Sequence, residues 1–407
     1  MKILQINGYE SPGRRFHGLS ITQILKKYGI ESKHLVWAKD TQDPEVLTFE
    51  GIIPRKINQI LQLIENQTSL QSILYRNVSK IIKMPAFQEA DLIHLHIIHS
   101  GYFSISDLSM ITDLKPTIWT LHDPWAMTGR CIYPMGCLGW RKDCGVCPDL
   151  NTPFAMKKDN SRFLFNYKRM AYEKANFDII IASKWMKDMV YSSPMFNDKE
   201  IKIHHLPFGI DLEFFSSDFT VSARKRFNIS EDKIVISFRS EDTHFKGYQY
   251  IMAALEKLET TKSICLLTVG RHNTLERFRG KFDIIELGWT NDDVLLRDVL
   301  SACDIFLMPS VAEAFGVMAI EAMACSKPVI VFDGDNSLPD VTFAPDVGIA
   351  VPMRDSHALS NAIKHLIDNP KERLDRGNKS REIAELHYSQ DLYIKNLVNI
   401  YKETLNK

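Results

Sequence analysis

Met308 to Ile330 run Met-Pro-Ser-Val-Ala-Glu-Ala-Phe-Gly-Val-Met-Ala-Ile-Glu-Ala-Met-Ala-Cys-Ser-Lys-Pro-Val-Ile. An apolar run, Asp304–Met308, leads into this segment, and a second one, Pro328–Phe332, follows it. Between them lies a short loop and then a stretch with helical spacing. The pattern predicts a buried strand, a loop, a helix and another buried strand, which is the repeating unit of a parallel sheet covered by helices.

The loop before this helix has the residues of an anion site. Gly316 lets the backbone come close to a ligand, and the N–H groups of Phe315, Gly316 and Val317 would begin the helix and meet a diphosphate. Glu321 lies about one turn into the helix, roughly 6 Å along its axis, where a carboxylate can accept hydrogen bonds from a ribose diol. Glu313 precedes the helix and could meet a sugar hydroxyl beside the phosphates.

The same alternation of apolar runs and helix-length stretches continues along the chain. We therefore predict an α/β protein with two doubly wound, Rossmann-like units. The predicted strands are Lys2–Ile6, Asp91–His96, Thr117–Leu121, Ile179–Ala182, Ile234–Phe238, Ile264–Val269, Asp304–Met308 and Pro328–Phe332.

The string from Met308 to Ile330, with Glu313 and Glu321 eight positions apart, resembles the Glu-x7-Glu signature of family 4 retaining glycosyltransferases. The resemblance covers nearly the whole chain. It implies the GT-B fold, in which two Rossmann-like domains face each other across a cleft. It also implies transfer of a sugar from a nucleoside-diphosphate sugar, with retention, by same-face attack and without a protein nucleophile.

Two basic residues follow the predicted strand Ile234–Phe238. In the family an Arg and a Lys-Gly pair at this place neutralise the nucleotide diphosphate, and the resemblance assigns these roles to Arg239 and Lys246. The role is physically reasonable because the leaving group gains negative charge as the glycosidic bond breaks.

The first half offers a Gly-rich loop and three histidines at strand ends. The loop after the first strand contains Gly13, and the corresponding loop of the family faces the donor diphosphate. His122 follows the strand Thr117–Leu121, where the family has a His that reaches the donor sugar, so Glu313 and His122 are the catalytic candidates. His96 and His99 follow another strand and are candidates for the acceptor side.

The domain boundary is predicted where Pro and Gly interrupt the chain near Pro207–Asp211. Residues 1–207 would form the acceptor domain and residues 208–389 the nucleotide-sugar donor domain. Residues 390–407 have helical spacing, and in the family such a final helix crosses back onto the first domain.

Composition excludes several classes of protein. The 407 residues are 45% hydrophobic and 25% charged, with 50 Lys and Arg against 50 Asp and Glu, which argues against a nucleic-acid binder. Residues 1–205 hold 26 basic against 20 acidic residues, so this half could face something anionic. No apolar run is long enough to cross a bilayer, and the start breaks too soon for a signal peptide. These features predict a cytoplasmic protein, with peripheral contact on the inner face of the cell membrane as a further expectation.

Residues 53–83 carry apolar positions at helical spacing together with basic residues. Two interpretations stay open. Basic amphipathic segments can lie on anionic membranes, and they can equally be a helix pair that packs against its own domain.

Four cysteines cluster between residues 131 and 147 with spacings of five, six and two residues. Four thiolates can close a tetrahedral zinc site, and the metal-ligand candidates are Cys131, Cys137, Cys144 and Cys147. Reduced thiols without metal and disulfides are the alternatives. Catalysis itself is predicted to need no cofactor.

The stretch from His122 to Pro148 resembles a subgroup of the family associated with bacterial surface polysaccharides such as capsule, O-antigen and exopolysaccharide. Such enzymes commonly act on lipid-linked glycan acceptors, which is the acceptor we expect. Two other functions stay open: a nucleotide-sugar epimerase of the same fold, and a non-catalytic scaffold for polysaccharide assembly.

Overall fold

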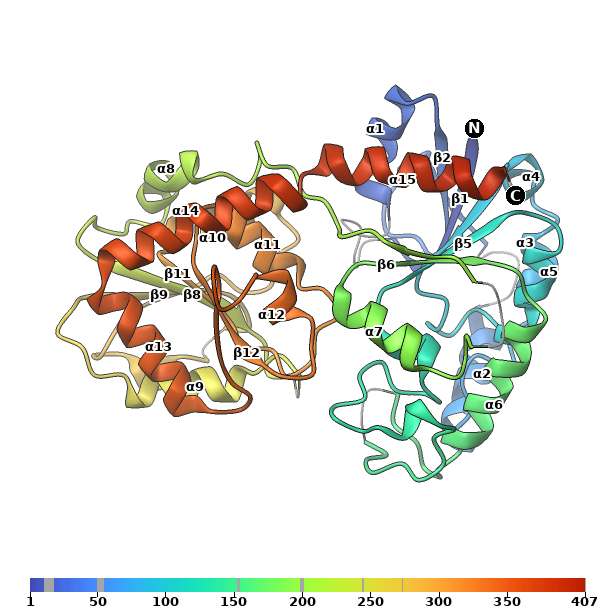
Figure 1. The fold of residues 1–407 in the computed structure, drawn as a ribbon, viewed down its shortest axis with the longest axis horizontal. Helices are drawn as coiled ribbons and strands as arrows, with labels where there is room; N and C mark the ends of the chain where they lie inside the picture. The colour runs from blue at the N-terminus through green and yellow to red at the C-terminus, as the bar shows by residue number, and fades with distance from the viewer. Residues whose placement is uncertain are drawn as a thin grey trace. The chain divides into compact units, whose positions relative to one another are not determined.

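The computed structural model describes residues 1–10, 18–49, 55–151, 154–197, 201–243, 245–272 and 274–406. The chain divides into two compact units (Figure 1). Unit 1 comprises Met1–Leu206 and Ile394–Lys407, and unit 2 comprises Pro207–Tyr393. Each unit has its own parallel sheet.

The sheet of unit 1 has the strand order β3-β2-β1-β4-β5-β6-β7, and all neighbouring strands are parallel. Its central strands are buried along their whole length because helices cover such a sheet on both faces. The strands are β1 (Lys2–Tyr9), β2 (Glu31–Ala38), β3 (Val46–Thr48), β4 (Leu92–Leu95), β5 (Thr117–Leu121), β6 (Asp178–Ile181) and β7 (Ile203–His205).

The helices of unit 1 are α1 (Thr22–Lys27), α2 (Arg55–Thr68), α3 (Val78–Ile81), α4 (Pro85–Glu89), α5 (Leu108–Thr112), α6 (Ser161–Glu173), α7 (Lys184–Ser192) and most of α15 (Gln390–Leu405). The last helix packs on the sheet through polar contacts. His94 Nδ1 lies 2.8 Å from the hydroxyl of Tyr401, and the hydroxyl of Thr404 donates to Asp178 at 2.9 Å. Burial lowers the pKa of His94 to about 3, so this histidine is a neutral core residue.

The sheet of unit 2 has the order β10-β9-β8-β11-β12-β13, again all parallel. Because the chain first adds strands on one side of β8 and then on the other, the order reverses between β8 and β11. The strands are β8 (Ile234–Ser240), β9 (Ile264–Gly270), β10 (Asp283–Glu286), β11 (Ile305–Met308), β12 (Val329–Asp333) and β13 (Ile349–Pro352).

Figure 1 shows helices on both sides of the second sheet, with α8, α10, α11 and α14 on one side and α9 and α13 on the other. This doubly wound arrangement confirms the predicted fold class. The helices of unit 2 are α8 (Thr220–Arg226), α9 (Tyr248–Lys257), α10 (Asp293–Ala302), α11 (Val317–Ala324), α12 (Leu338–Val341), α13 (Ser356–Asp368) and α14 (Pro370–His387). Among the residues described, no helix in either unit is both long and apolar enough to span a membrane.

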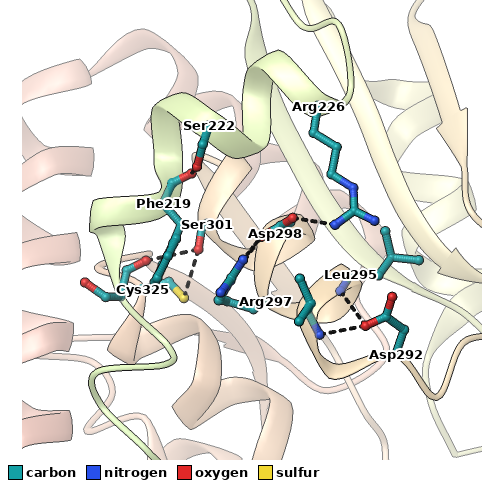
Figure 2. Close-up of polar contacts among 11 residues, drawn as sticks. Phe219, Ser222, Arg226, Asp292, Leu295, Arg297, Asp298, Ser301 and Cys325 are labelled. Carbon is teal, nitrogen blue, oxygen red and sulfur yellow. Dashed lines mark hydrogen bonds and ion pairs between the residues drawn. The ribbon is translucent and has the colours of Figure 1, made fainter.

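A network of charges ties α8 to α10 (Figure 2). Asp298 is almost fully buried, and its carboxylate accepts from Arg226 at 2.6 Å and from Arg297 at 2.7 Å. Asp292 caps the start of α10 by accepting from the N–H groups of Val294 and Leu295. This cap gives partners to N–H groups of the first turn, which have none within the helix.

We expect Asp298→Ala to destabilise unit 2 by about 1–3 kcal/mol, because two guanidinium groups lose a shared carboxylate that is sheltered from water. The shift of the urea midpoint measures this effect. Asp368→Ala is the matched control, since Asp368 forms a solvent-exposed pair with Lys364 on α13. An equal effect of both substitutions would show that shelter from water adds nothing to the Asp298 network.

Candidate functional site

Two loops leave the sheet of unit 2 where its strand order reverses. They follow β8 and β11, which are hydrogen-bonded neighbours. In open α/β sheets, ligands bind outside the carboxyl ends of strands at such a reversal. The two loops, the end of β8 and the start of α11 together contain most of the donor-site candidates predicted from the sequence.

The loop after β11 ends in a glycine with a left-handed backbone. Gly316 has φ 91°, and a Cβ there would lie 2.5 Å from a methyl carbon of Leu338. The helix α11 begins directly after it at Val317, so the first N–H groups of the helix lie at the loop. The ring of Phe315 is buried against Phe208 and Tyr388. Phe315 can therefore offer a ligand its backbone but not its side chain.

Lys246 and Glu313 form an ion pair across the two loops. The Nζ atom of Lys246 lies 2.7 Å from a carboxylate oxygen of Glu313, and both side chains are largely sheltered from solvent. The pair joins a cation suited to a phosphate to a carboxylate suited to a sugar hydroxyl. A ligand that carries both a phosphate and a sugar hydroxyl could contact Lys246 and Glu313 at the same time.

The backbone fixes the position of this pair. Gly247 has φ 75°, and a methyl group there would overlap the carbonyl oxygen of Pro309. The N–H of Val311 donates to the carbonyl of Phe245 at 2.8 Å. On the other side, the N–H of Ser337 donates to the carbonyl of Glu313 at 3.0 Å. Loops after three strands thus hold the pair in place.

Arg239 lies at the end of β8 and is oriented by two neighbours. Its Nε atom lies 2.7 Å from a carboxylate oxygen of Glu241, and its guanidinium lies 4.7 Å from the ring centroid of Trp289. Trp289 is 66% exposed. Sequence reasoning did not identify Trp289. The available signal was Leu287-Gly288-Trp289, a large aromatic side chain directly after a glycine.

Glu321 lies on α11 and is fully buried, with 0% exposure. The sequence placed this residue one turn into the helix, where the structure has it. A ribose diol could reach its carboxylate only if the groups packed around it move.

In unit 1 two of the predicted histidines lie together. His96 Nδ1 lies 2.9 Å from His122 Nε2, and their rings are stacked. His96 Nε2 lies 2.8 Å from the side-chain oxygen of Gln5 on β1. His122 and His96 follow β5 and β4, which pair with each other, so the two residues meet at the same sheet edge.

His99 has a different partner. Its Nε2 atom lies 2.9 Å from a carboxylate oxygen of Asp123. Burial alone would raise the pKa of Asp123, but His99 and the N–H of Trp125 outweigh this effect and lower it. Gly13, the remaining donor-site candidate, lies outside the described residues.

The four clustered cysteines form no disulfide and are partly buried. Burial raises the pKa of Cys131 to about 11 and that of Cys144 to about 12, and the charges of neighbouring thiols add to both shifts. In the part of the chain that the structure describes, no group of three or more His, Cys, Asp or Glu side chains is arranged to hold a metal ion. Zinc therefore stays a prediction.

Known proteins resemble the chain in sequence and in structure. Residues 221–383, all within unit 2, match the family model described as glycosyl transferases group 1. A protein of Escherichia coli (strain K12) named for glycosyl transfer in colanic acid biosynthesis is 22% identical over 253 residues, which is 60% of each chain. A diphospho-undecaprenol N-acetylgalactosaminyltransferase of Campylobacter jejuni is 26% identical over 206 residues, covering 48% of this chain and 53% of that one. The match thus spans little more than half the length of these curated relatives.

Structural similarity extends over the whole chain. The Anabaena protein HepE, solved in complex with UDP-glucose, aligns with 99% of this chain and 100% of its own, with a TM-score of 0.70 and 16% identity. At 16% identity, this similarity supports the fold alone. Together the matches confirm the GT-B fold, and the similarity to the glycosyl transferases group 1 model extends over residues 221–383.

Proposed function

We propose that the protein is a retaining glycosyltransferase. It would move a sugar from a nucleoside-diphosphate sugar to a hydroxyl of a glycan acceptor in the assembly of a surface polysaccharide. Unit 2 would bind the donor and unit 1 the acceptor. The observation that carries this proposal is the Lys246–Glu313 ion pair beside the start of α11, at the point where the strand order of unit 2 reverses.

The pair supports donor binding because of the charges that the reaction develops. The leaving diphosphate gains negative charge as the glycosidic bond breaks, so a fixed cation and helix N–H groups stabilise the transition state more than the ground state. Lys246, Arg239 and the N–H groups at Gly316 and Val317 would supply these charges. Glu313 would orient the sugar.

The acceptor side would be built by histidines of unit 1. His96 is buried and holds His122 through its Nδ1 atom, so a donor or acceptor hydroxyl would meet the oriented imidazole ring of His122. His99, anchored by Asp123, would lie farther along the acceptor. In the same-face mechanism the acceptor hydroxyl passes its proton to the leaving phosphate, and the protein contributes by positioning and charge.

A lipid-linked acceptor at the inner face of the cell membrane is part of the proposal. The Campylobacter relative is named for an acceptor carried on diphospho-undecaprenol. The surplus of basic residues in the first half of the chain favours an anionic acceptor.

Thermal unfolding with a panel of nucleoside diphosphates and nucleotide sugars tests the donor site. A ligand that binds only the folded state adds about 2.7 kcal/mol at a hundred times its dissociation constant, which is seen as a higher Tm. We expect one base to give this shift and Glu321→Gln to reduce it, because the substitution replaces one of the two accepting carboxylate oxygens by an NH2 group, which donates. Glu259→Gln, at an exposed site, is the control. No shift with any nucleotide would favour the scaffold instead.

A metal analysis tests the zinc prediction. If zinc binds, protein purified without chelator contains one zinc per chain, and substituting Cys144 by Ser removes it. Binding would have to displace protons from thiols whose pKa values are raised, so it should weaken as the pH falls. Four reactive thiols per cluster and no zinc would contradict the prediction in favour of reduced cysteines.

A further inference from the structure

Two imidazole rings of unit 1 belong to a chain of side-chain hydrogen bonds that begins at a serine. The amide nitrogen of Gln5 donates to the hydroxyl of Ser32 at 2.8 Å, and the amide oxygen of Gln5 lies 2.8 Å from Nε2 of His96. At its other nitrogen, Nδ1, His96 lies 2.9 Å from Nε2 of His122. The bonds thus run from Ser32 through Gln5 and His96 to His122, and the first three residues are buried.

The packing of unit 1 holds the side chain of Gln5 in place. Gln5 lies on β1, between β2 and β4, and has no exposed surface. Gly18 has φ 88°, and a Cβ there would overlap the amide group of Gln5. The backbone at Gly18 therefore comes as close to this amide as a residue without a side chain allows.

The bonds of Gln5 decide which nitrogen of His96 carries the hydrogen. An amide oxygen can only accept, so Nε2 of His96 donates to it. His96 is 2% exposed, and burial favours the neutral form of an imidazole, which has a single N–H group. Its Nδ1 atom is therefore an acceptor, and the hydrogen of the next bond belongs to Nε2 of His122.

We propose that Gln5 is a positioning residue that sets the tautomer of His122 through His96, so that His122 faces the substrate with Nδ1 as a hydrogen-bond acceptor. The inference rests on the proposed function, in which His122 meets a sugar hydroxyl. A nitrogen that accepts needs a substrate group that donates. A hydroxyl can do so, whereas an ether oxygen, a carbonyl oxygen or an ionised carboxylate cannot.

Nuclear magnetic resonance of the full chain, labelled with nitrogen-15 in histidine, tests the tautomer without any ligand. Long-range correlations between ring protons and ring nitrogens distinguish a protonated nitrogen from a bare one, and His122→Asn identifies the signals of His122. At about pH 8.5, two units above the ordinary pKa of histidine, we expect the hydrogen of His122 on Nε2. Gln5→Met should move about half or more of the population to Nδ1, because His96 loses the acceptor of its Nε2–H group.

Two further variants show whether the effect belongs to the relay. Gln71→Met is the matched control: Gln71 is another buried glutamine of unit 1, and its amide oxygen accepts from the indole N–H of Trp125 at 2.9 Å. This variant should keep the wild-type tautomer of His122. Ser32→Ala removes only the partner of the Gln5 amide nitrogen and should give a mixture of both tautomers, which keeps the test available if Gln5→Met does not fold.

Donor analogues with fluorine in place of one hydroxyl test the selection of a hydroxyl. Fluorine cannot donate, so at one sugar position the replacement should lower kcat/KM of the wild type at least tenfold. With Gln5→Met the same replacement should cost less than about threefold, because a protonated Nδ1 no longer requires a donor. Comparing the two enzymes cancels the effect of fluorine on the reactivity of the sugar. A fluorine effect that Gln5→Met leaves unchanged would overturn this selection.

Two spectra would overturn the relay itself. The first has His122 of the wild type protonated on Nδ1, as an amide of Gln5 turned over would require, or on both nitrogens, which the nearby charge of Asp123 favours. The second has a tautomer that Gln5→Met and Ser32→Ala both leave unchanged. The nucleotide shift of Tm, measured on the same samples, separates the two proposals. If nucleotides bind and the tautomer is wrong, only the relay falls; if the tautomer is as expected and no nucleotide binds, the proposed reaction falls.

Discussion

Replacing Lys246 by alanine is expected to lower the rate of sugar transfer by about 10²–10³-fold, because one positioned charge at the leaving group is worth that much in a sheltered site. The loss should appear in kcat more than in KM, since the diphosphate charge grows toward the transition state. Glu313→Gln should give a loss of similar size. The measurement is initial-rate kinetics with the donor that the nucleotide panel identifies.

The ion pair makes the two losses interdependent. Lys246→Ala leaves the carboxylate of Glu313 without its cation beside an anionic ligand, so Lys246→Ala with Glu313→Gln should lose less than the product of the single losses. Lys257→Ala, an exposed lysine at the end of α9, is the control and should stay within twofold of the wild type. Near-normal turnover by Lys246→Ala in folded protein would remove this residue from the donor site.

Gly247→Ala is expected to cost about 2–4 kcal/mol of folding stability, which combines the strain of a positive φ with a steric overlap. The added methyl group meets the backbone carbonyl of Pro309, which cannot move away as a flexible side chain could. Relief requires the loop after β8 to separate from the loop after β11. We therefore expect Lys246 and Glu313 to separate as well, and nucleotide binding to fall together with Tm.

Gly280→Ala isolates the contribution of the backbone angle. Gly280 has φ 90° in the same unit, but no atom lies within 4 Å of the added methyl group. Its substitution should cost only about 1 kcal/mol and leave nucleotide binding unchanged. Calorimetry measures the loss of stability of both variants. Equal losses would show that the contact with Pro309 does not contribute to the cost of Gly247→Ala.

The sequence predicted most of the inner strands of both sheets, but it missed the edge strands and the inner strand β2, which begins with Glu31, Ser32 and Lys33. All eight predicted strands are present, because central strands of a parallel sheet are continuous apolar runs. The strands β3 and β7 have three residues each, which is too short for a pattern. The strand β10 is partly exposed and begins with Asp283, so solvent relaxes the demand for apolar side chains.

Individual site residues could be predicted more readily than their arrangement. Lys246, Glu313 and Gly316 could each be predicted separately, because they are charged residues or glycines that follow strands. That Lys246 pairs with Glu313 depends on two loops brought together by neighbouring strands, and no local pattern encodes it. Spacing gave the helical position of Glu321 but not its complete burial, which depends on the side chains packed over α11.

The same limit applies to α2. Its periodicity predicts a helix and an apolar side, but periodicity does not say which side faces the domain. Asn58 and Glu65 determine which side of α2 faces the domain. Asn58 bonds to the backbone of Gly101, which is remote along the chain, and Glu65 bonds to the backbone of Ser72, which it reaches only after the chain has folded back.

The membership of α15 in unit 1 has a consequence for how the chain is made. The partners of Tyr401 and Thr404 are His94 and Asp178, yet residues 207–393 must be synthesised between them. On the ribosome, unit 2 can complete its sheet first. Part of the core of unit 1 stays exposed to solvent until α15 has been synthesised. During that interval chaperones have the greatest opportunity to bind it, so the first unit to emerge is the last one able to finish folding.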